Sequence, residues 1–160
     1  MLKVFILCGC PGSGKTTWRE KFCLENPMYF CLCPDEYRKI LGKDSSDQSV
    51  SALAFLSVKQ DMRKKLENNK SVIIDATNMY RKTRKQFLDI AKKYNAETIA
   101  VVFEVDRETL IKRNQKRGAD GGRNVPVEII DKMLSKYERP EIGEFDDVIM
   151  CSTEKTWTPV

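Results

Sequence analysis

The feature that most constrains this chain is a glycine-rich run between an apolar stretch and a helical one. Residues 2–8 are predominantly apolar, too few for a stable helix, and end at Gly9. The next residues, Gly9–Thr16, read Gly-Cys-Pro-Gly-Ser-Gly-Lys-Thr, and residues 16–24 have helical character. A glycine loop that joins a buried strand to a helix is typical of the first unit of a parallel α/β sheet.

The rest of the chain alternates between strand and helix in the same way. We predict strands at 28–33, 71–75, 97–105 and 147–151, and helices at 35–41, 50–66, 84–94, 107–117 and 127–137. This alternation predicts a three-layer α/β/α fold with a mainly parallel sheet of about five strands. The length of 160 residues suits one domain, 1–160, with 42–48 and 118–124 as its mobile segments.

Composition excludes several kinds of catalytic site. The chain has no histidine, so it cannot form a Ser-His-Asp triad, a Cys-His dyad or a His-ligated zinc site. Acid–base chemistry therefore falls to carboxylates, lysine, tyrosine or cysteine. An excess of 28 Lys and Arg over 23 Asp and Glu gives a net charge of +5, which suits an anionic partner.

Two Cys-x-Cys pairs, at 8/10 and 31/33, permit a zinc interpretation. We favour buried free thiols in a reducing cytosol, because strand spacing points each pair to one face and Cys10 lies in the glycine loop. No apolar stretch has the length of a membrane span, and the N-terminus has no signal-peptide core. We therefore expect a soluble cytoplasmic protein without a membrane partner.

The glycine run fits the full G-x-x-x-x-G-K-[ST] phosphate-loop pattern in its proper strand–helix context. Its backbone, from Gly9 through Cys10, Pro11, Gly12 and Ser13 to Gly14, is expected to wrap around phosphate oxygens at the start of the helix. Lys15 is expected to bridge the β- and γ-phosphates, and the Thr16 hydroxyl to ligate Mg²⁺. The sequence therefore predicts ATP and Mg²⁺ as cofactors.

The second strand is followed by Asp35 and Arg38, which lie one helical turn apart. The carboxylate is a candidate general base for an attacking hydroxyl, and the arginine a candidate ligand for an anionic part of the acceptor. The alternative is an N-cap with a solvated ion-pair partner. Because ligands bind beyond the carboxyl ends of parallel strands, their position beside the phosphate loop favours the functional interpretation.

The third strand ends in Asp75, followed by Thr77 and Asn78. A carboxylate at this point is expected to hold Mg²⁺ or its water shell opposite Thr16, with Thr77 and Asn78 adding substrate contacts. The alternative interpretation is that Asp75 begins a turn and Asn78 caps the next helix, and both roles can coexist.

A basic helix end precedes a glycine-rich segment. Arg113 and Arg117 lie four residues apart, and Arg123 follows among the glycines. Like charges at this spacing repel unless an anion lies among them. We predict a mobile lid over about 113–125 whose arginines close on the triphosphate, against the alternative of a solvated basic surface.

Together these motifs resemble the P-loop polynucleotide kinase family and the wider group of small P-loop kinases. The resemblance covers nearly the whole chain and is strongest to the phage-type kinase domain. It is carried by Gly9–Lys15 with Thr17-Trp18, by Asp35 with Tyr37 and Arg38, by Leu110–Gly118 and by Val125-Pro126.

The resemblance implies transfer of the ATP γ-phosphoryl group to a 5′-hydroxyl end of RNA or DNA. It implies that Asp35 is the general base, that Arg38 holds a phosphate of the acceptor strand, and that Arg117 and Arg113 are lid arginines acting with Lys15 in catalysis. Thr17, Arg123 and Val125 are implied as further nucleotide contacts. The Asp75-Ala76-Thr77-Asn78 spacing departs from the phage-type pattern and resembles bacterial and animal members.

Two other functions fit the same framework. A kinase of a nucleoside, sugar or antibiotic would use residues 42–60 as its acceptor pocket. A nucleotide-dependent switch would hydrolyse ATP slowly and would not need the Asp35/Arg38 pair.

Overall fold

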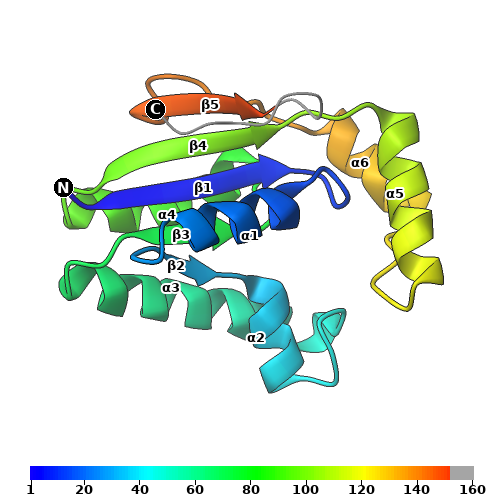
Figure 1. Ribbon diagram of the computed structural model, residues 1–160, viewed down its shortest axis with the longest axis horizontal. Coiled ribbons are helices and arrows are strands. Elements are labelled where there is room, and N and C mark those ends of the chain that lie inside the picture. Colours follow the sequence, from blue (N-terminus) through cyan, green and yellow to red (C-terminus); the bar gives the residue numbers. More distant parts are fainter. Residues whose placement is uncertain (152–160) are drawn as a thin grey trace.

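The computed structural model describes residues 1–151 and contains a five-stranded sheet of order β2-β3-β1-β4-β5 (Figure 1). The strands are β1 (Lys3–Gly9), β2 (Phe30–Leu32), β3 (Val72–Asp75), β4 (Glu97–Phe103) and β5 (Asp147–Cys151). Every neighbouring pair is parallel. The predicted sheet is therefore confirmed, while residues 152–160 of the predicted domain lie outside the described residues.

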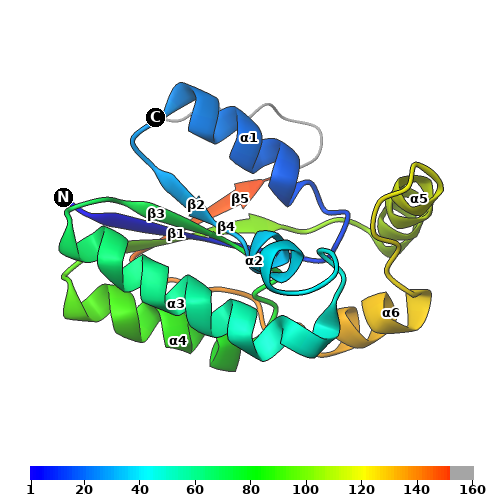
Figure 2. The same ribbon diagram turned by 90° about the horizontal axis from the view of Figure 1, so that it is seen from below.

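The described residues also form six α-helices and a 3₁₀ turn at Gln48–Val50. The helices are α1 (Lys15–Glu25), α2 (Pro34–Leu41), α3 (Ser51–Glu67), α4 (Arg81–Lys93), α5 (Arg107–Ala119) and α6 (Val127–Ser135). Figure 2 shows α1 on one face of the sheet and α3 with α4 on the other. Helices α2, α5 and α6 lie beyond the carboxyl ends of the strands. The predicted three-layer fold is confirmed. None of these helices combines the length and apolar character needed to cross a membrane.

Both faces of the sheet are buried in apolar clusters. Along β1, Val4 and Ile6 pack in the cluster formed with α3 and α4, while Phe5 and Leu7 pack in the cluster that contains Phe22 of α1. Because helices cover both faces of the sheet, the central strands consist mainly of apolar residues and do not alternate between apolar and polar ones.

The chain is more regular than predicted at the edges of the two glycine-containing segments. Helix α5 continues through Gly118 to Ala119, and the Gly122 N–H then donates to the Arg117 carbonyl at 2.8 Å. The other segment leads into the 3₁₀ turn, where the Asp47 carboxylate accepts from the Ser49 N–H at 3.0 Å. Both segments retain hydrogen-bonded structure, and their mobility stays a prediction.

The apolar face of α4 carries a fully buried arginine, Arg84. Its guanidinium donates to both carboxylate oxygens of Glu144 at 2.7 and 3.0 Å, and to the Asn78 carbonyl at 2.9 Å. This bidentate pair joins α4 to the segment before β5. A buried cation of this kind is tolerated because its hydrogen bonds are satisfied.

We expect Arg84→Met to lower the free energy of unfolding by about 3–5 kcal/mol, because it leaves the Glu144 carboxylate without its cation. Adding Glu144→Met should restore part of this loss. The exposed pair Arg81–Glu141 serves as the control, and Arg81→Met should cost about 1 kcal/mol or less. Urea unfolding of the four proteins measures these differences; equal losses for Arg84→Met and Arg81→Met would contradict the interpretation.

Candidate active site

The phosphate loop between β1 and α1 has the backbone that an anion cradle requires. Gly12 and Gly14 have φ of +84° and +98°, in the left-handed region where successive N–H groups turn toward one point. Ser13 is buried, and its hydroxyl has no hydrogen-bond partner within the described part of the chain. The Lys15 ammonium donates to the carbonyls of Gly9 and Cys10 at 2.7 and 2.9 Å. This donor-rich loop fits a phosphate group.

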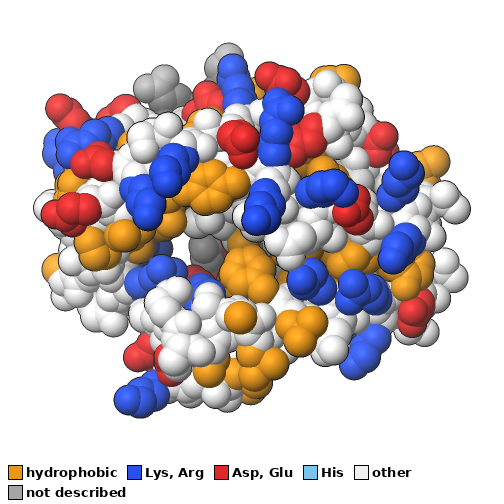
Figure 3. Space-filling view, turned by 180° about the vertical axis from the view of Figure 1, so that it is seen from behind, with side chains coloured by type: hydrophobic (Ala, Val, Ile, Leu, Met, Phe, Trp, Pro, Cys, Tyr) orange, Lys and Arg blue, Asp and Glu red, His pale blue; other side chains and the backbone are white. Residues whose placement is uncertain are grey.

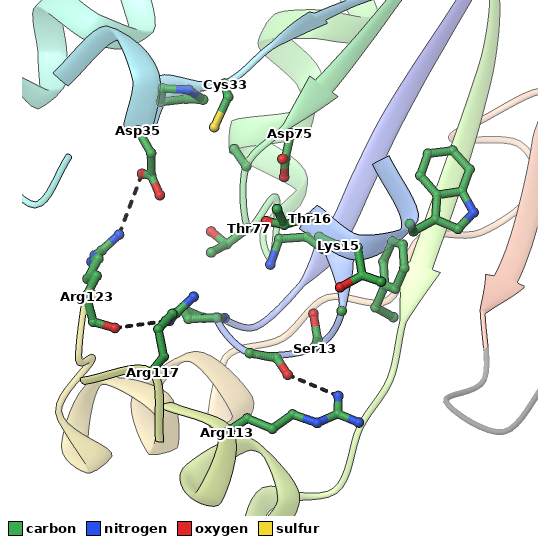
Figure 4. A pocket seen from close by; sticks show the side chains of 18 of the residues that line it. Ser13, Lys15, Thr16, Cys33, Asp35, Asp75, Thr77, Arg113, Arg117 and Arg123 are labelled. Atoms are coloured by element: carbon green, nitrogen blue, oxygen red, sulfur yellow. Dashed lines mark hydrogen bonds and ion pairs between the residues drawn. The ribbon is translucent and has the colours of Figure 1, made fainter. Parts of the chain in front are cut away.

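A buried carboxylate faces the loop from the end of β3. Figure 4 shows Asp75 on the same side of the cleft as Lys15 and Thr16. Asp75 forms an ion pair with Arg19 of α1 at 3.0 Å. Burial raises the pKa of Asp75, and the cations Lys15 and Arg19 oppose this shift. Burial also lowers the pKa of Lys15 to about 8, against the attraction of Asp75.

The Thr16 hydroxyl and the Asp75 carboxylate present oxygen ligands of the type Mg²⁺ prefers (Figure 4). Within residues 1–151 no group of three His, Cys, Asp or Glu side chains is arranged to hold a metal ion. This donor set fits a Mg²⁺ ion that completes its shell with nucleotide phosphates and water. The cysteines are free thiols, and burial raises the pKa of Cys8 to about 12.

Asp35, at the start of α2, lies across the cleft from the phosphate loop. Its Oδ1 contacts Arg38 Nη2 and lies 3.6 Å from Arg123 Nη1. Figure 4 shows the other carboxylate oxygen directed toward the middle of the cleft. The carboxylate is thus held on one oxygen and open on the other, the arrangement a general base needs.

The capping alternatives are not seen. Cys33, rather than Asp35, is the N-cap of α2, and Tyr80, rather than Asn78, is the N-cap of α4. Arg38 is not a solvated partner either, since it is 6% exposed and also donates to the Ser45 carbonyl at 2.9 Å.

Helix α5 brings arginines to the other side of the loop. Arg113 Nη1 donates to the Gly12 carbonyl at 3.2 Å. Arg117 donates from Nε to the Arg123 carbonyl at 2.8 Å. Burial lowers the pKa of Arg117 and of Arg38, and the nearby Arg123 lowers both further. Cations crowded in this way favour an anion between them.

These groups line one cleft of about 820 Å³, a volume in the usual range for a ligand site. Figure 3 shows its mouth from behind as a hollow with Lys and Arg side chains nearby. The predicted residues that line it are Pro11, Gly12, Ser13, Gly14, Lys15, Thr16, Thr17, Asp35, Arg38, Asp75, Thr77, Arg113, Arg117 and Arg123.

Four predicted residues are not brought to the cleft surface. Gly9 and Cys10 supply carbonyls to Lys15 from beneath the loop. Asn78 is buried, and its amide donates to the Leu7 carbonyl of β1 at 2.8 Å. Val125 packs in an apolar cluster with Cys10 and other core residues. In this structure the side chains of Asn78 and Val125 support the cleft from behind, and their predicted ligand contacts stay predictions.

Sequence reasoning missed several lining or supporting residues. Arg19 lies one turn after Lys15 on α1, so helical spacing was the available signal. Asn114 lies three residues before Arg117 and is buried against the phosphate loop. Met133 of α6 also lines the cleft, and no local pattern marks it. Gln48 and Ser51 line the cleft too, and both fall within residues 42–60, the acceptor pocket expected for a small-molecule kinase.

The lowered pKa of Lys15 predicts a proton linkage on nucleotide binding. Above about pH 8 the free protein holds Lys15 largely neutral, whereas a bound phosphate favours the ammonium, so binding takes up a proton there and not near pH 6. Titration calorimetry of Mg-ADP at about pH 8.5, in two buffers of different ionisation enthalpy, measures this uptake. Lys15→Met should abolish it; an unchanged proton count would contradict the assignment to Lys15.

Comparison with known proteins gives relatives over almost the whole chain. L-seryl-tRNA(Sec) kinase of Methanococcus maripaludis is 28% identical over 161 residues, covering 95% of this chain and 60% of that protein. Human heterogeneous nuclear ribonucleoprotein U-like protein 2 is 27% identical over 165 residues, covering 96% of this chain and 22% of that protein. The chain therefore spans 60% or less of the length of these two relatives.

Solved structures share the architecture. A chain of the Pnkp1/Rnl/Hen1 RNA repair complex matches with a TM-score of 0.76 and 28% identity, over 84% of this chain and 43% of that one. A putative kinase from Chloroflexus aurantiacus has a TM-score of 0.76 at 15% identity, over 93% of this chain and 86% of that one, which shows the fold alone. A family model described as an AAA domain matches residues 4–140. The chain therefore belongs to this AAA domain family, as a P-loop kinase domain.

Proposed function

We propose that this protein is an ATP-dependent, Mg²⁺-dependent kinase that phosphorylates the 5′-hydroxyl end of RNA or DNA. One observation carries the proposal: a single cleft has a phosphate loop at one end and the Asp35 carboxylate, open on one oxygen, at the other. A donor phosphate and an acceptor hydroxyl bound there would meet between Lys15 and Asp35.

In the proposed reaction Asp35 accepts the proton of the acceptor hydroxyl as its oxygen attacks the γ-phosphorus. The new O–P bond forms while the bond from the γ-phosphorus to the bridging oxygen breaks, and ADP leaves. Lys15, Arg113 and Arg117 stabilise the negative charge on the transferring group. Mg²⁺, held by Thr16 and Asp75, supplies further charge neutralisation when bound.

The charge of the cleft supports an anionic acceptor. Its basic lining residues are Lys15, Lys21, Arg38, Arg113, Arg117 and Arg123, and its acidic ones are Glu25, Asp35 and Asp75. Two relatives at 28% identity are named for RNA, a seryl-tRNA kinase and a component of an RNA repair complex.

Free cysteines suit a reducing compartment, so we place the enzyme in the cytoplasm.

We expect the protein, with Mg²⁺ and γ-labelled ATP, to label an oligonucleotide that ends in a 5′-hydroxyl and not its 5′-phosphorylated copy. Asp35→Asn should reduce transfer by about 10²–10⁴-fold, because the base is lost, while ADP affinity changes little. Asp89→Asn on the exposed surface of α4 is the matched control.

A second arm replaces the oligonucleotide with nucleosides, sugars and seryl-tRNA. Transfer to one of these alone would refute the 5′-end assignment and identify another kinase activity. ATP hydrolysis unaffected by Asp35→Asn, without transfer to any acceptor, would favour a nucleotide switch.

Acceptor binding through several phosphates should depend on salt. At saturating ATP, the KM for a 5′-hydroxyl oligonucleotide should rise about tenfold between about 50 and 200 mM salt, because two or three phosphate contacts release counterions. A dinucleoside monophosphate acceptor should show a much smaller change. Equal responses of the two acceptors would contradict multiple phosphate contacts.

A further inference from the structure

One buried side chain joins the lid to the phosphate loop. Asn114 of α5 is 1% exposed, and its amide nitrogen donates to the Pro11 carbonyl at 2.7 Å and to the Leu110 carbonyl at 2.9 Å. The fit is close, since a Cβ on Gly12 would lie 2.7 Å from this nitrogen. Asn114 therefore fixes where α5 lies relative to the loop.

The oxygen of the same amide faces the arginines. Asn114 Oδ1 accepts from Arg117 Nη2 at 2.6 Å. Arg117 in turn donates from Nε to the Arg123 carbonyl, and the Arg123 guanidinium pairs with Asp35. A continuous chain of polar contacts thus runs from the phosphate loop to the carboxylate across the cleft. Figure 4 shows its last two links, from Arg117 to Arg123 and from Arg123 to Asp35.

We propose that Asn114 is a positioning residue, which uses its two amide atoms to set Arg117 against the transferring phosphate. The amide nitrogen of Asn114 is hydrogen-bonded to the phosphate loop, and the amide oxygen is hydrogen-bonded to one nitrogen of the Arg117 guanidinium. Nε is bound to the Arg123 carbonyl and Nη2 to Asn114, so Nη1 of Arg117, which has no partner among residues 1–151, can bind the phosphoryl group. This inference rests on the proposed phosphoryl transfer, and not on the identity of the acceptor.

A purely structural role for Asn114 makes a different prediction. If the amide served only to hold the loop in shape, its loss would weaken the binding of every nucleotide alike. If the amide positions Arg117 for the transition state, losing the amide weakens the binding only of ligands that carry the charge of the transition state. The distinction is measurable without any acceptor substrate.

The first experiment compares binding of Mg-ADP and of Mg-ADP with aluminium fluoride, which mimics the transferring phosphoryl group. For Asn114→Leu we expect ADP affinity within about twofold of the wild type and about tenfold weaker binding of the aluminium fluoride complex, the effect of a lost charge-assisted hydrogen bond. Gln115→Leu, on the exposed side of α5, is the matched control and should change neither. Equal losses for both ligands, or a wild type without preference for the aluminium fluoride complex, would overturn the proposal.

The second experiment is a double-mutant cycle with Arg117. If Asn114 acts through Arg117, Asn114→Leu should have no further effect on aluminium fluoride binding in the Arg117→Ala protein. Additive losses would refute this. Should Asn114→Leu not fold, Asn114→Ala replaces it: it also removes the oxygen that accepts from Arg117, so we expect the same selective loss.

These outcomes are separable from those of the proposed function. Failure to phosphorylate any oligonucleotide would reject the 5′-end assignment and leave the binding comparison valid. Loss of the aluminium fluoride preference in Asn114→Leu, together with normal 5′-end labelling by the wild type, supports both.

Discussion

The parallel pairing of β1 with β3 and β4 is the constraint on which the cleft depends. Parallel ladders bring the carboxyl ends of the strands to one edge, so the phosphate loop, Asp35 and Asp75 meet there although they are far apart in sequence. Two contacts fix the ends of β1 and β3 beyond the ladder. The Gly9 N–H donates to the Thr77 carbonyl at 2.9 Å, and the Asn78 amide donates to the Leu7 carbonyl. The buried pair Arg84–Glu144 then anchors the segment that carries Asn78, because Arg84 also donates to the Asn78 carbonyl.

On this frame the cleft gathers more positive charge than its own carboxylates neutralise. Near the loop Asp75 is shared by Lys15 and Arg19, and across the cleft Asp35 is shared by Arg38 and Arg123. Within residues 1–151, Arg113 and Arg117 donate to main-chain carbonyls and to the Asn114 amide oxygen, and neither forms an ion pair. This excess of positive charge favours an anion beside Arg117, where burial lowers the pKa of the guanidinium.

Much of this was predictable from the sequence, for identifiable reasons. The strand–helix alternation follows from local hydrophobic patterns, and the phosphate loop from residue types with fixed spacing, so both were predicted with nearly the observed bounds. Asp35 and Asp75 were found because polar residues that end apolar strands share one sheet edge. Apart from Arg38, which was expected beside Asp35, the partners of these groups were not predicted. Arg19, Asn114 and the Arg84–Glu144 pair are defined by contacts between helices and loops, which depend on tertiary packing rather than on any periodic pattern.

The two halves of the cleft also differ in whether a local sequence pattern or tertiary packing defines them. The half at the phosphate loop is made largely of main chain, with glycines in left-handed conformations and a lysine bonded to loop carbonyls, so it is specified by a short motif. The opposite half is lined by side chains such as Gln48, Ser51, Phe55 and Met133, which come from separate segments. Proteins that share this fold accordingly differ in name: one is a seryl-tRNA kinase at 28% identity, and solved structures of the same fold include an RNA kinase and a sugar kinase. The proposed function therefore assigns acceptor choice to the α2–α3 junction and to α6, and binding of the phosphate donor to the loop.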